Sequence, residues 1–90
     1  MKVKRKIQKI IDGNTFKIHR SIHQPMNSSR YIKVVGLDYI KENKKWIDFL
    51  NKNALGKIVS IYPIGRSYGK IVATVPYFKT LVKEFEKDES

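Results

Sequence analysis

The sequence predicts one small α+β domain in which five β-strands close into a barrel and helices cover it. The chain has 90 residues, enough for a single hydrophobic core, so residues 1–90 are expected to form one domain. Its 41% hydrophobic content shows a bias toward Val, Ile, Phe and Tyr, which favour strands. The hydrophobic period also changes after Asp38 from the two residues of a strand to the helical spacing of about 3.6.

The first three predicted strands occupy residues 3–11, 15–22 and 30–37. Asp12-Gly13-Asn14 is typical of a tight hairpin turn, because Gly and Asn tolerate positive φ. The second strand alternates, with Phe16, Ile18 and Ile22 expected inside and Thr15, Lys17, His19 and Ser21 outside. Residues 23–29 contain a proline and show no period, so they predict a loop.

A helix over residues 43–55 is predicted by apolar residues at helical spacing, with Asn43 as N-cap and Gly56 as stop. One member of that apolar face, Trp46, is expected in the core. Residues 57–64 and 70–75 predict the last two strands, joined by a hairpin connection at 65–69. Beyond Pro76, a short closing helix is expected before an acidic tail at 84–90.

The predicted order is therefore β-β-β-α-β-β-α, which is the order of the five-stranded OB barrel with a helix plugging one end. That fold binds oligonucleotides across one face and the adjoining loops. Barrel closure also protects the strand edges of a small β protein. An SH3-like barrel is the alternative, because such barrels are also small, five-stranded and often basic.

The net charge of +11 is concentrated in residues 1–83, which carry 18 basic and 4 acidic side chains, a net of +14. Such a field attracts polyanions, so DNA or RNA is the expected partner. An acidic protein and an anionic membrane surface are the alternatives for the charge. The acidic tail could fold back over the basic face and weaken non-specific binding.

Several classes of protein are excluded by composition. The absence of cysteine excludes disulfides, a thiol nucleophile and zinc sites with thiolate ligands, and nothing near His19 or His23 completes a metal site. No apolar run approaches the roughly 20 residues needed to cross a bilayer, and no signal-peptide segment follows the N-terminal charges. We therefore expect a cytoplasmic monomer without a membrane partner.

Three segments carry a resemblance to a known family. Ile11-Asp12-Gly13-Asn14-Thr15 is similar to the hairpin I-D-G-D-T, and the nine residues KVVGLDYIK at 33–41 are similar to R-L-x-G-I-D-T-P-E. Tyr68-Gly69-Lys70 is similar to Y-G-R between the fourth and fifth strands. In this order the motifs resemble the staphylococcal nuclease (thermonuclease) family over about residues 7–83, which implies an OB fold.

The resemblance implies a catalytic set that is largely replaced here. The family's two calcium-binding carboxylates correspond to Asn14 and Asp38. Its two phosphate-clamping arginines correspond to Lys33 and Lys70, and the Glu that positions the attacking water corresponds to Lys41.

These replacements predict that phosphate attraction is kept while hydrolysis is lost. Calcium affinity depends on ligand charge, so Asn14 and Asp38 are vestigial metal candidates and no cofactor is expected. Lysine lacks the bidentate fork of arginine, and losing the carboxylate base costs a factor of about 10²–10⁴. The alternative is a divergent calcium-dependent nuclease or phosphodiesterase that uses Asp38 and Glu42. On an extended segment, however, Glu42 and residue 41 would point to opposite sides.

The sequence-based hypothesis is a nucleic-acid-binding module that holds the phosphates of a single strand with little sequence preference. Lys33, Arg66 and Lys70 would hold phosphates, and Tyr68 would contact a base or sugar. The alternative for Tyr68 is a turn aromatic that packs on the barrel rim. The track would be extended by N-terminal basic residues: Lys4, Arg5, Lys6 and Lys9. An interaction module for an acidic protein partner is the remaining alternative.

Overall fold

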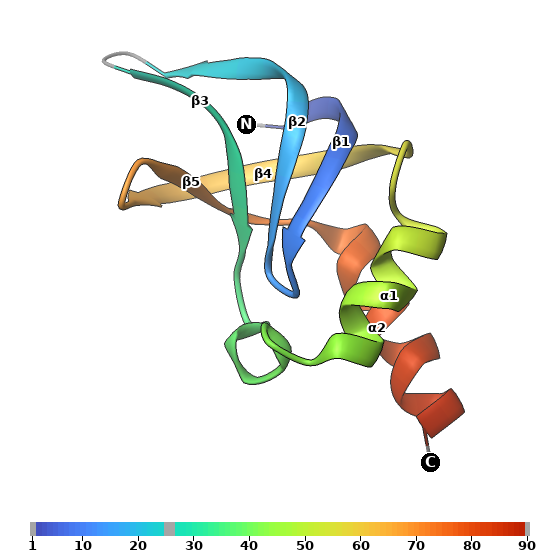
Figure 1. Ribbon diagram of the computed structural model, residues 1–90. Coiled ribbons are helices and arrows are strands. Elements are labelled where there is room, and N and C mark those ends of the chain that lie inside the picture. Colours follow the sequence, from blue (N-terminus) through green and yellow to red (C-terminus); the bar gives the residue numbers. More distant parts are fainter. Residues whose placement is uncertain (1, 25–26, 90) are drawn as a thin grey trace.

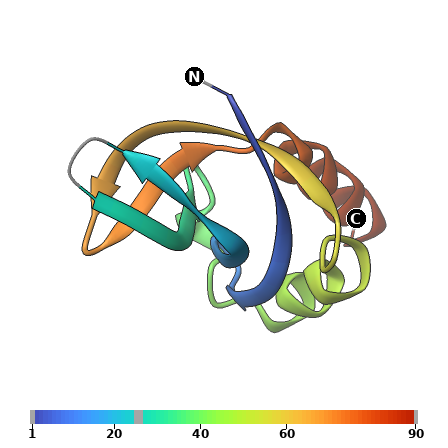
Figure 2. The same ribbon diagram turned by 90° about the horizontal axis from the view of Figure 1, so that it is seen from above.

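The computed structural model describes residues 2–24 and 27–89. Five strands form a closed barrel in the order β1-β2-β3-β5-β4, and two α-helices lie together at one side of it (Figures 1 and 2). The elements are β1 (Val3–Asp12), β2 (Thr15–Gln24), β3 (Asn27–Val34), the 3₁₀-helix η1 (Asp38–Ile40), α1 (Lys44–Asn53), β4 (Ile58–Ser67), β5 (Lys70–Thr74) and α2 (Pro76–Glu89). The predicted five-stranded barrel with two helices is confirmed, and its architecture is compatible with an OB-like fold.

Closure of the barrel depends on two pairings between strands that are distant in sequence. β3 pairs with β5 in parallel, with Ile32 opposite Ile71. The N-terminal half of β1 pairs with β4, with Val3 opposite Ile61, whereas its C-terminal half pairs with β2. Because β1 contributes to both neighbours, no edge of the five-stranded sheet is left open along this strand.

The hairpins are longer than the sequence predicts. The expected loop at 23–29 is wrong in most positions, because β2 continues to Gln24 and β3 begins at Asn27; Pro25 and Met26 lie outside the described residues. β3 also ends at Val34 and not at residue 37. In the same way β4 continues to Ser67, so the expected connection at 65–69 shrinks to two residues. Ile64, Gly65 and Arg66 near the end of β4 are all exposed, and a hairpin end that is exposed on both faces shows no apolar alternation, which is the signal that sequence patterns detect.

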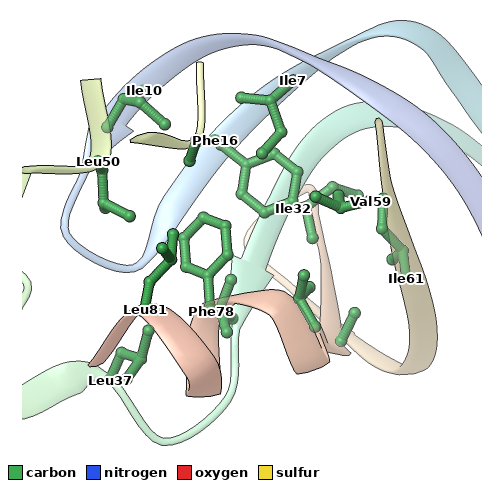
Figure 3. Packing of buried hydrophobic residues seen from close by; sticks show 14 of the residues in the cluster. Ile7, Ile10, Phe16, Ile32, Leu37, Leu50, Val59, Ile61, Phe78 and Leu81 are labelled. Carbon is green, nitrogen blue, oxygen red and sulfur yellow. The ribbon is translucent and has the colours of Figure 1, made fainter. Parts of the chain in front are cut away.

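The barrel interior is filled by apolar side chains from every strand and from α2 (Figure 3). Phe16, Ile18 and Ile22 are buried as predicted, and the Phe16 ring stacks on Phe78 of α2 with ring centroids 5.2 Å apart. Thr15, expected outside, is buried, and its hydroxyl donates a hydrogen bond to the Asn14 side chain at 3.0 Å. A buried hydroxyl needs such a partner, which a pattern of alternation does not reveal.

The two helices are joined by aromatic contacts. The Asn43 side chain accepts a hydrogen bond from the Trp46 backbone N–H at 3.0 Å, so the predicted N-cap is confirmed. Trp46 is fully buried, as expected, and lies 5.2 Å from Phe85 and 5.8 Å from Phe49 between ring centroids. α2 extends to Glu89, so residues 84–89 belong to a helix and not to a separate tail.

The pKa of Tyr39 in η1 is raised, mainly by desolvation and to a lesser extent by the charge of Glu86 on α2. No helix within the described residues has both the length and the apolar character needed to span a bilayer.

The turn Asp12-Gly13-Asn14, called the β1–β2 turn below, is docked against the segment between β3 and α1. The Gly13 N–H donates to the Lys41 carbonyl at 2.7 Å, and the Trp46 indole N–H donates to the Gly13 carbonyl at 2.7 Å. A Cβ atom on Gly13 would lie within 3.0 Å of the Ile40 carbonyl oxygen, the Lys41 Cα and the Trp46 ring. Glycine is therefore required here by close backbone approach.

We predict that Gly13→Ala lowers the free energy of unfolding by about 1–3 kcal/mol, because the added methyl group meets backbone on two sides. Urea denaturation monitored by Trp46 fluorescence measures this change. Gly65→Ala is the matched control, since nothing lies within 4 Å of its Cβ, and it should change stability by less than about 0.5 kcal/mol. Equal effects of the two substitutions would contradict the proposed constraint.

Candidate nucleic-acid interface

A row of basic and aromatic side chains crosses the outer surface of four adjacent strands. Lys9 on β1 is paired with Lys17 on β2, and Lys17 is paired with Tyr31 on β3. Because Ile32 pairs with Ile71, the neighbour of Tyr31 on β5 is Lys70. The Lys17 ammonium lies 5.9 Å from the centroid of the exposed Tyr31 ring, which is a cation–π distance.

Lys33 extends this surface by one further row. It is paired with Val72 on β5, and Val72 shares a face with Lys70 two residues earlier. Lys33 and Lys70 are both half-buried, an arrangement in which aliphatic stems pack on the sheet while ammonium groups reach water. We call this surface the basic face; it consists of Lys9, Lys17, Tyr31, Lys33 and Lys70.

Arg66 is not on the same face as Lys70. It is paired with Ile71, whereas Ser67 is paired with Lys70, and successive side chains of a strand point to opposite sides. Arg66 is exposed on the other side of the β4–β5 hairpin.

The N-terminal basic residues likewise lie on different faces of β1. Lys4 and Lys6 pair with β4 and are exposed, whereas Arg5 between them is half-buried on the opposite side of β1. Only Lys9 belongs to the basic face.

Tyr68 occupies the tip of the β4–β5 hairpin in an unfavourable conformation. Its φ is +50° and that of Gly69 is +77°, as a two-residue type I′ turn requires. A non-glycine residue in this region costs about 1–2 kcal/mol. The side chain is 100% exposed, so the alternative in which it packs on the barrel rim is wrong. An exposed aromatic ring held at a conformational cost suggests a role in binding.

Lys17 and Tyr31 are not among the binding residues that the sequence predicts. The alternation of β2 places Lys17 outside, but it does not give the register of β2 against β3. The sequence signal for a binding surface is a tyrosine on a strand that also carries outward-facing lysines. This signal identifies the surface only when the strand register is known, because the register pairs Lys17 with Tyr31.

Asn14 and Asp38, the two positions that resemble a calcium site, are hydrogen-bonded to each other. Asn14 is 2% exposed, and its side-chain N–H donates to the Asp38 carboxylate at 2.7 Å. The Asn14 side-chain oxygen accepts from the Thr15 hydroxyl, so both ends of the amide have partners. As metal ligands, a neutral amide and a carboxylate that already accepts a hydrogen bond do not fit a calcium ion. Within residues 2–24 and 27–89, no group of three or more His, Asp or Glu side chains is placed to hold a metal.

The residues that follow Asp38 form a helical turn. Asp38–Ile40 forms a 3₁₀-helix, so the expectation of an extended segment there is wrong. The backbone turns because the Lys41 N–H and the Ile40 N–H donate to carbonyls three residues earlier. Lys41 and Glu42 are exposed, and the Lys41 carbonyl is used to dock the β1–β2 turn.

Comparisons with protein-family models, with curated proteins and with solved structures found no match. The class of protein is therefore defined by the fold and the surface: a small, strongly basic, closed five-stranded barrel with two helices, compatible with an OB-like fold. Its function is inferred from the basic face and its surroundings.

We predict that Asn14→Asp destabilises the protein at pH 7 by about 2–3 kcal/mol, because it replaces a hydrogen bond by two adjacent carboxylates. The folded state would bind a proton at this pair more tightly than the unfolded chain, so the pKa of the pair would be raised. The loss of stability is therefore complete above that raised pKa, and it disappears as the pH falls toward about 4, the pKa of a carboxyl group in the unfolded chain. Chemical denaturation from pH 4 to pH 8 measures it.

Asn51→Asp on the exposed surface of α1 is the control, because it also adds a charge and removes an amide hydrogen bond, here the one to the Ile47 carbonyl at 3.0 Å; its expected change is below about 1 kcal/mol. A pH-independent loss in Asn14→Asp would contradict the carboxylate pair. Stabilisation of the wild-type protein by millimolar calcium would contradict the conclusion that Asn14 and Asp38 do not fit the ion.

We predict that Tyr68→Asn stabilises the fold and weakens nucleic-acid binding at the same time. Asn-Gly is the preferred pair for a type I′ turn, so the free energy of unfolding should rise by about 1 kcal/mol. Loss of one stacking ring should weaken single-strand binding by about 1–3 kcal/mol. Thermal unfolding and fluorescence anisotropy provide the two measurements. Tyr62→Ala, on β4, is the control for loss of an exposed tyrosine and should leave binding unchanged.

Proposed function

We propose that this chain is a nucleic-acid-binding module that holds the phosphates of a single strand on its basic face, with little sequence preference. The observation that carries the proposal is the continuous row from Lys9 through Lys17 and Tyr31 to Lys70. Alternating ammonium groups and an exposed aromatic ring are the two elements that single-strand binding uses. Tyr68 at the neighbouring hairpin tip would supply a second ring.

The architecture supports this proposal by analogy. OB barrels bind oligonucleotides across one face of the barrel and the loops beside it, including the loop between the fourth and fifth strands. The basic face and the Tyr68 turn lie at those places in this chain. The resemblance of residues 7–83 to staphylococcal nuclease adds that Lys33 and Lys70 stand where that family places phosphate-binding arginines.

The same resemblance supports binding without hydrolysis. A water molecule would need a carboxylate base and a cation to attack a phosphodiester, as the family resemblance implies. Here the Asp38 carboxylate accepts a hydrogen bond from Asn14. The resemblance aligns Lys41 with the carboxylate that the family uses as base. The ammonium groups of the basic face attract phosphate, but a lysine ammonium bears no lone pair for proton abstraction.

The affinity for a single-stranded oligonucleotide should fall steeply with salt. About four or five phosphate contacts give a slope of log K against log salt concentration near about −3. Lys17→Ala and Lys70→Ala should each reduce the slope by about 0.7, with similar effects on different base sequences. Fluorescence anisotropy at several salt concentrations measures this dependence.

Lys79→Ala is the control for these charge deletions, because Lys79 is exposed on α2 and outside the basic face. It should change neither the slope nor the affinity beyond the error of the measurement. Binding that is insensitive to salt, or equal effects of Lys79→Ala and Lys17→Ala, would contradict the proposed interface. Failure to bind any oligonucleotide at about 50 mM salt would leave an acidic protein as the leading partner.

Incubation of labelled DNA or RNA with the protein and millimolar calcium is expected to leave the substrate intact. The reason is the replacement of the water-positioning glutamate by Lys41 and the engagement of Asp38 by Asn14. Gel electrophoresis of the products measures cleavage. Cleavage that disappears in Asp38→Ala would support the divergent nuclease.

A further inference from the structure

A pocket of about 450 Å³ on β1, β2 and β3 has a lining dominated by positive side chains. We call it the arginine pocket; its lining consists of Arg5, His19, Arg20, Ser21 and Arg30. No carboxylate is among these residues within the described part of the chain. Three guanidinium groups around one hollow repel one another, so the arrangement favours an anion between them.

The pocket forms where the strand pairing is irregular. The regular pairing of β2 with β3 is interrupted between Lys17 and Ile22, and His19, Arg20 and Ser21 lie in this interval. Arg30 on β3 faces the interruption, and its Nε–H donates to the Ile18 carbonyl at 3.1 Å. The side chain thus satisfies a backbone acceptor while its guanidinium lines the hollow.

Two of the arginines are held in place by neutral acceptors. Arg30 also donates from Nη2 to the Gln8 side-chain oxygen at 2.8 Å. Arg5 donates from Nη1 to the Lys4 carbonyl at 2.9 Å and from Nη2 to the Ser21 carbonyl at 3.5 Å. Because these bonds restrict the long side chains before any ligand arrives, less conformational entropy is lost on binding. Each guanidinium has five N–H donors, so both retain donors for a further acceptor.

One donor of a residue that lines the pocket is unsatisfied. The Nε of Arg5 is buried and has no hydrogen-bond partner within the described structure. A buried unpaired donor adds to the cost of holding Arg5 in this place. The three guanidinium groups, with no carboxylate among the lining residues, call for an oxygen-rich anion.

We propose that the arginine pocket binds a phosphomonoester dianion. Guanidinium groups match the oxygens of a phosphate with paired N–H donors, which lysine cannot do. Three guanidinium groups also favour the two charges of a terminal phosphate over the single charge of a phosphate inside a nucleic-acid backbone. If the proposed function holds, the ligand is the terminal phosphate of a bound strand.

A second hollow connects the pocket to the basic face. It has a volume of about 340 Å³ and shares Ser21 and Arg30 with the arginine pocket. Its remaining lining comes from Ser29, Tyr31 and Gly69, and the Ser29 hydroxyl donates to the Gly69 carbonyl at 3.0 Å. A strand whose end lies in the arginine pocket would therefore continue past Tyr31 toward the Tyr68 turn.

The pocket itself is tested with inorganic phosphate, followed by the ¹H–¹⁵N signals of the Arg5 Nε–H and the His19 ring. Saturable shifts of both signals in the wild type, lost in Arg20→Ala, are the expected result. Arg20 is exposed, so its removal leaves the core intact, and Lys79→Ala is the control for loss of one charge. The absence of such shifts would overturn the proposal.

The source of the phosphate is tested with three oligonucleotides of one sequence, carrying a 5′-phosphate, a 3′-phosphate or neither. At least one phosphorylated form should bind about tenfold more tightly than the unphosphorylated form, and Arg30→Lys should abolish the preference because it keeps the charge and loses the fork. Equal affinities for all three would overturn the assignment to a strand end. Binding to phosphatidic-acid vesicles that requires Arg20, without any oligonucleotide preference, would overturn it in favour of a lipid headgroup.

These two experiments separate the pocket from the proposed function. Saturable phosphate shifts in a protein that binds no oligonucleotide would support the pocket and reject nucleic-acid binding. Salt-dependent oligonucleotide binding with no phosphate response would support the basic face and reject the pocket.

Discussion

The close approach of the β1–β2 turn to the segment before α1 is the contact on which the rest of the structure depends. Gly13 donates to one carbonyl and accepts from the Trp46 indole, with no room for a side chain between them. Trp46 in turn contacts Phe85, so the turn is tied to both helices. One buried tryptophan with a satisfied N–H group thus contacts the barrel turn and α2 from its place on α1.

The same turn explains how a site that resembles a metal centre can serve a structural purpose. Asn14 donates to Asp38 and accepts from Thr15, and its carbonyl accepts from the Val34 N–H at 2.7 Å. A cation between two carboxylates can join two segments of chain, and a neutral amide facing one carboxylate joins them without a cation. The contact between the β1–β2 turn and η1 is therefore made by a hydrogen bond and needs no ion.

The two positively charged surfaces, the basic face and the arginine pocket, adjoin each other on β2 and β3. The basic face and the arginine pocket meet near Arg30 and Tyr31, where one hollow touches both. The adjacent hairpin places Tyr68 in a strained and fully exposed position. None of these features contributes to the apolar core, and clustered like charges oppose folding, so a ligand that neutralises them would stabilise the native state.

The sequence by itself determined that five strands and two helices form, the helix cap at Asn43, the burial of Phe16, Ile18 and Ile22 on β2, and the large positive charge. These depend on local periodicity, capping chemistry and total charge, which are properties of neighbouring residues or of the chain as a whole. Only the tertiary structure decided that Lys17 stands beside Tyr31, that Arg66 leaves the face of Lys70, and that Arg5 shares a pocket with Arg30. The physical reason is register: a shift of one residue in a strand pair turns every side chain to the other face, and local sequence does not specify that shift where both faces of a hairpin are polar.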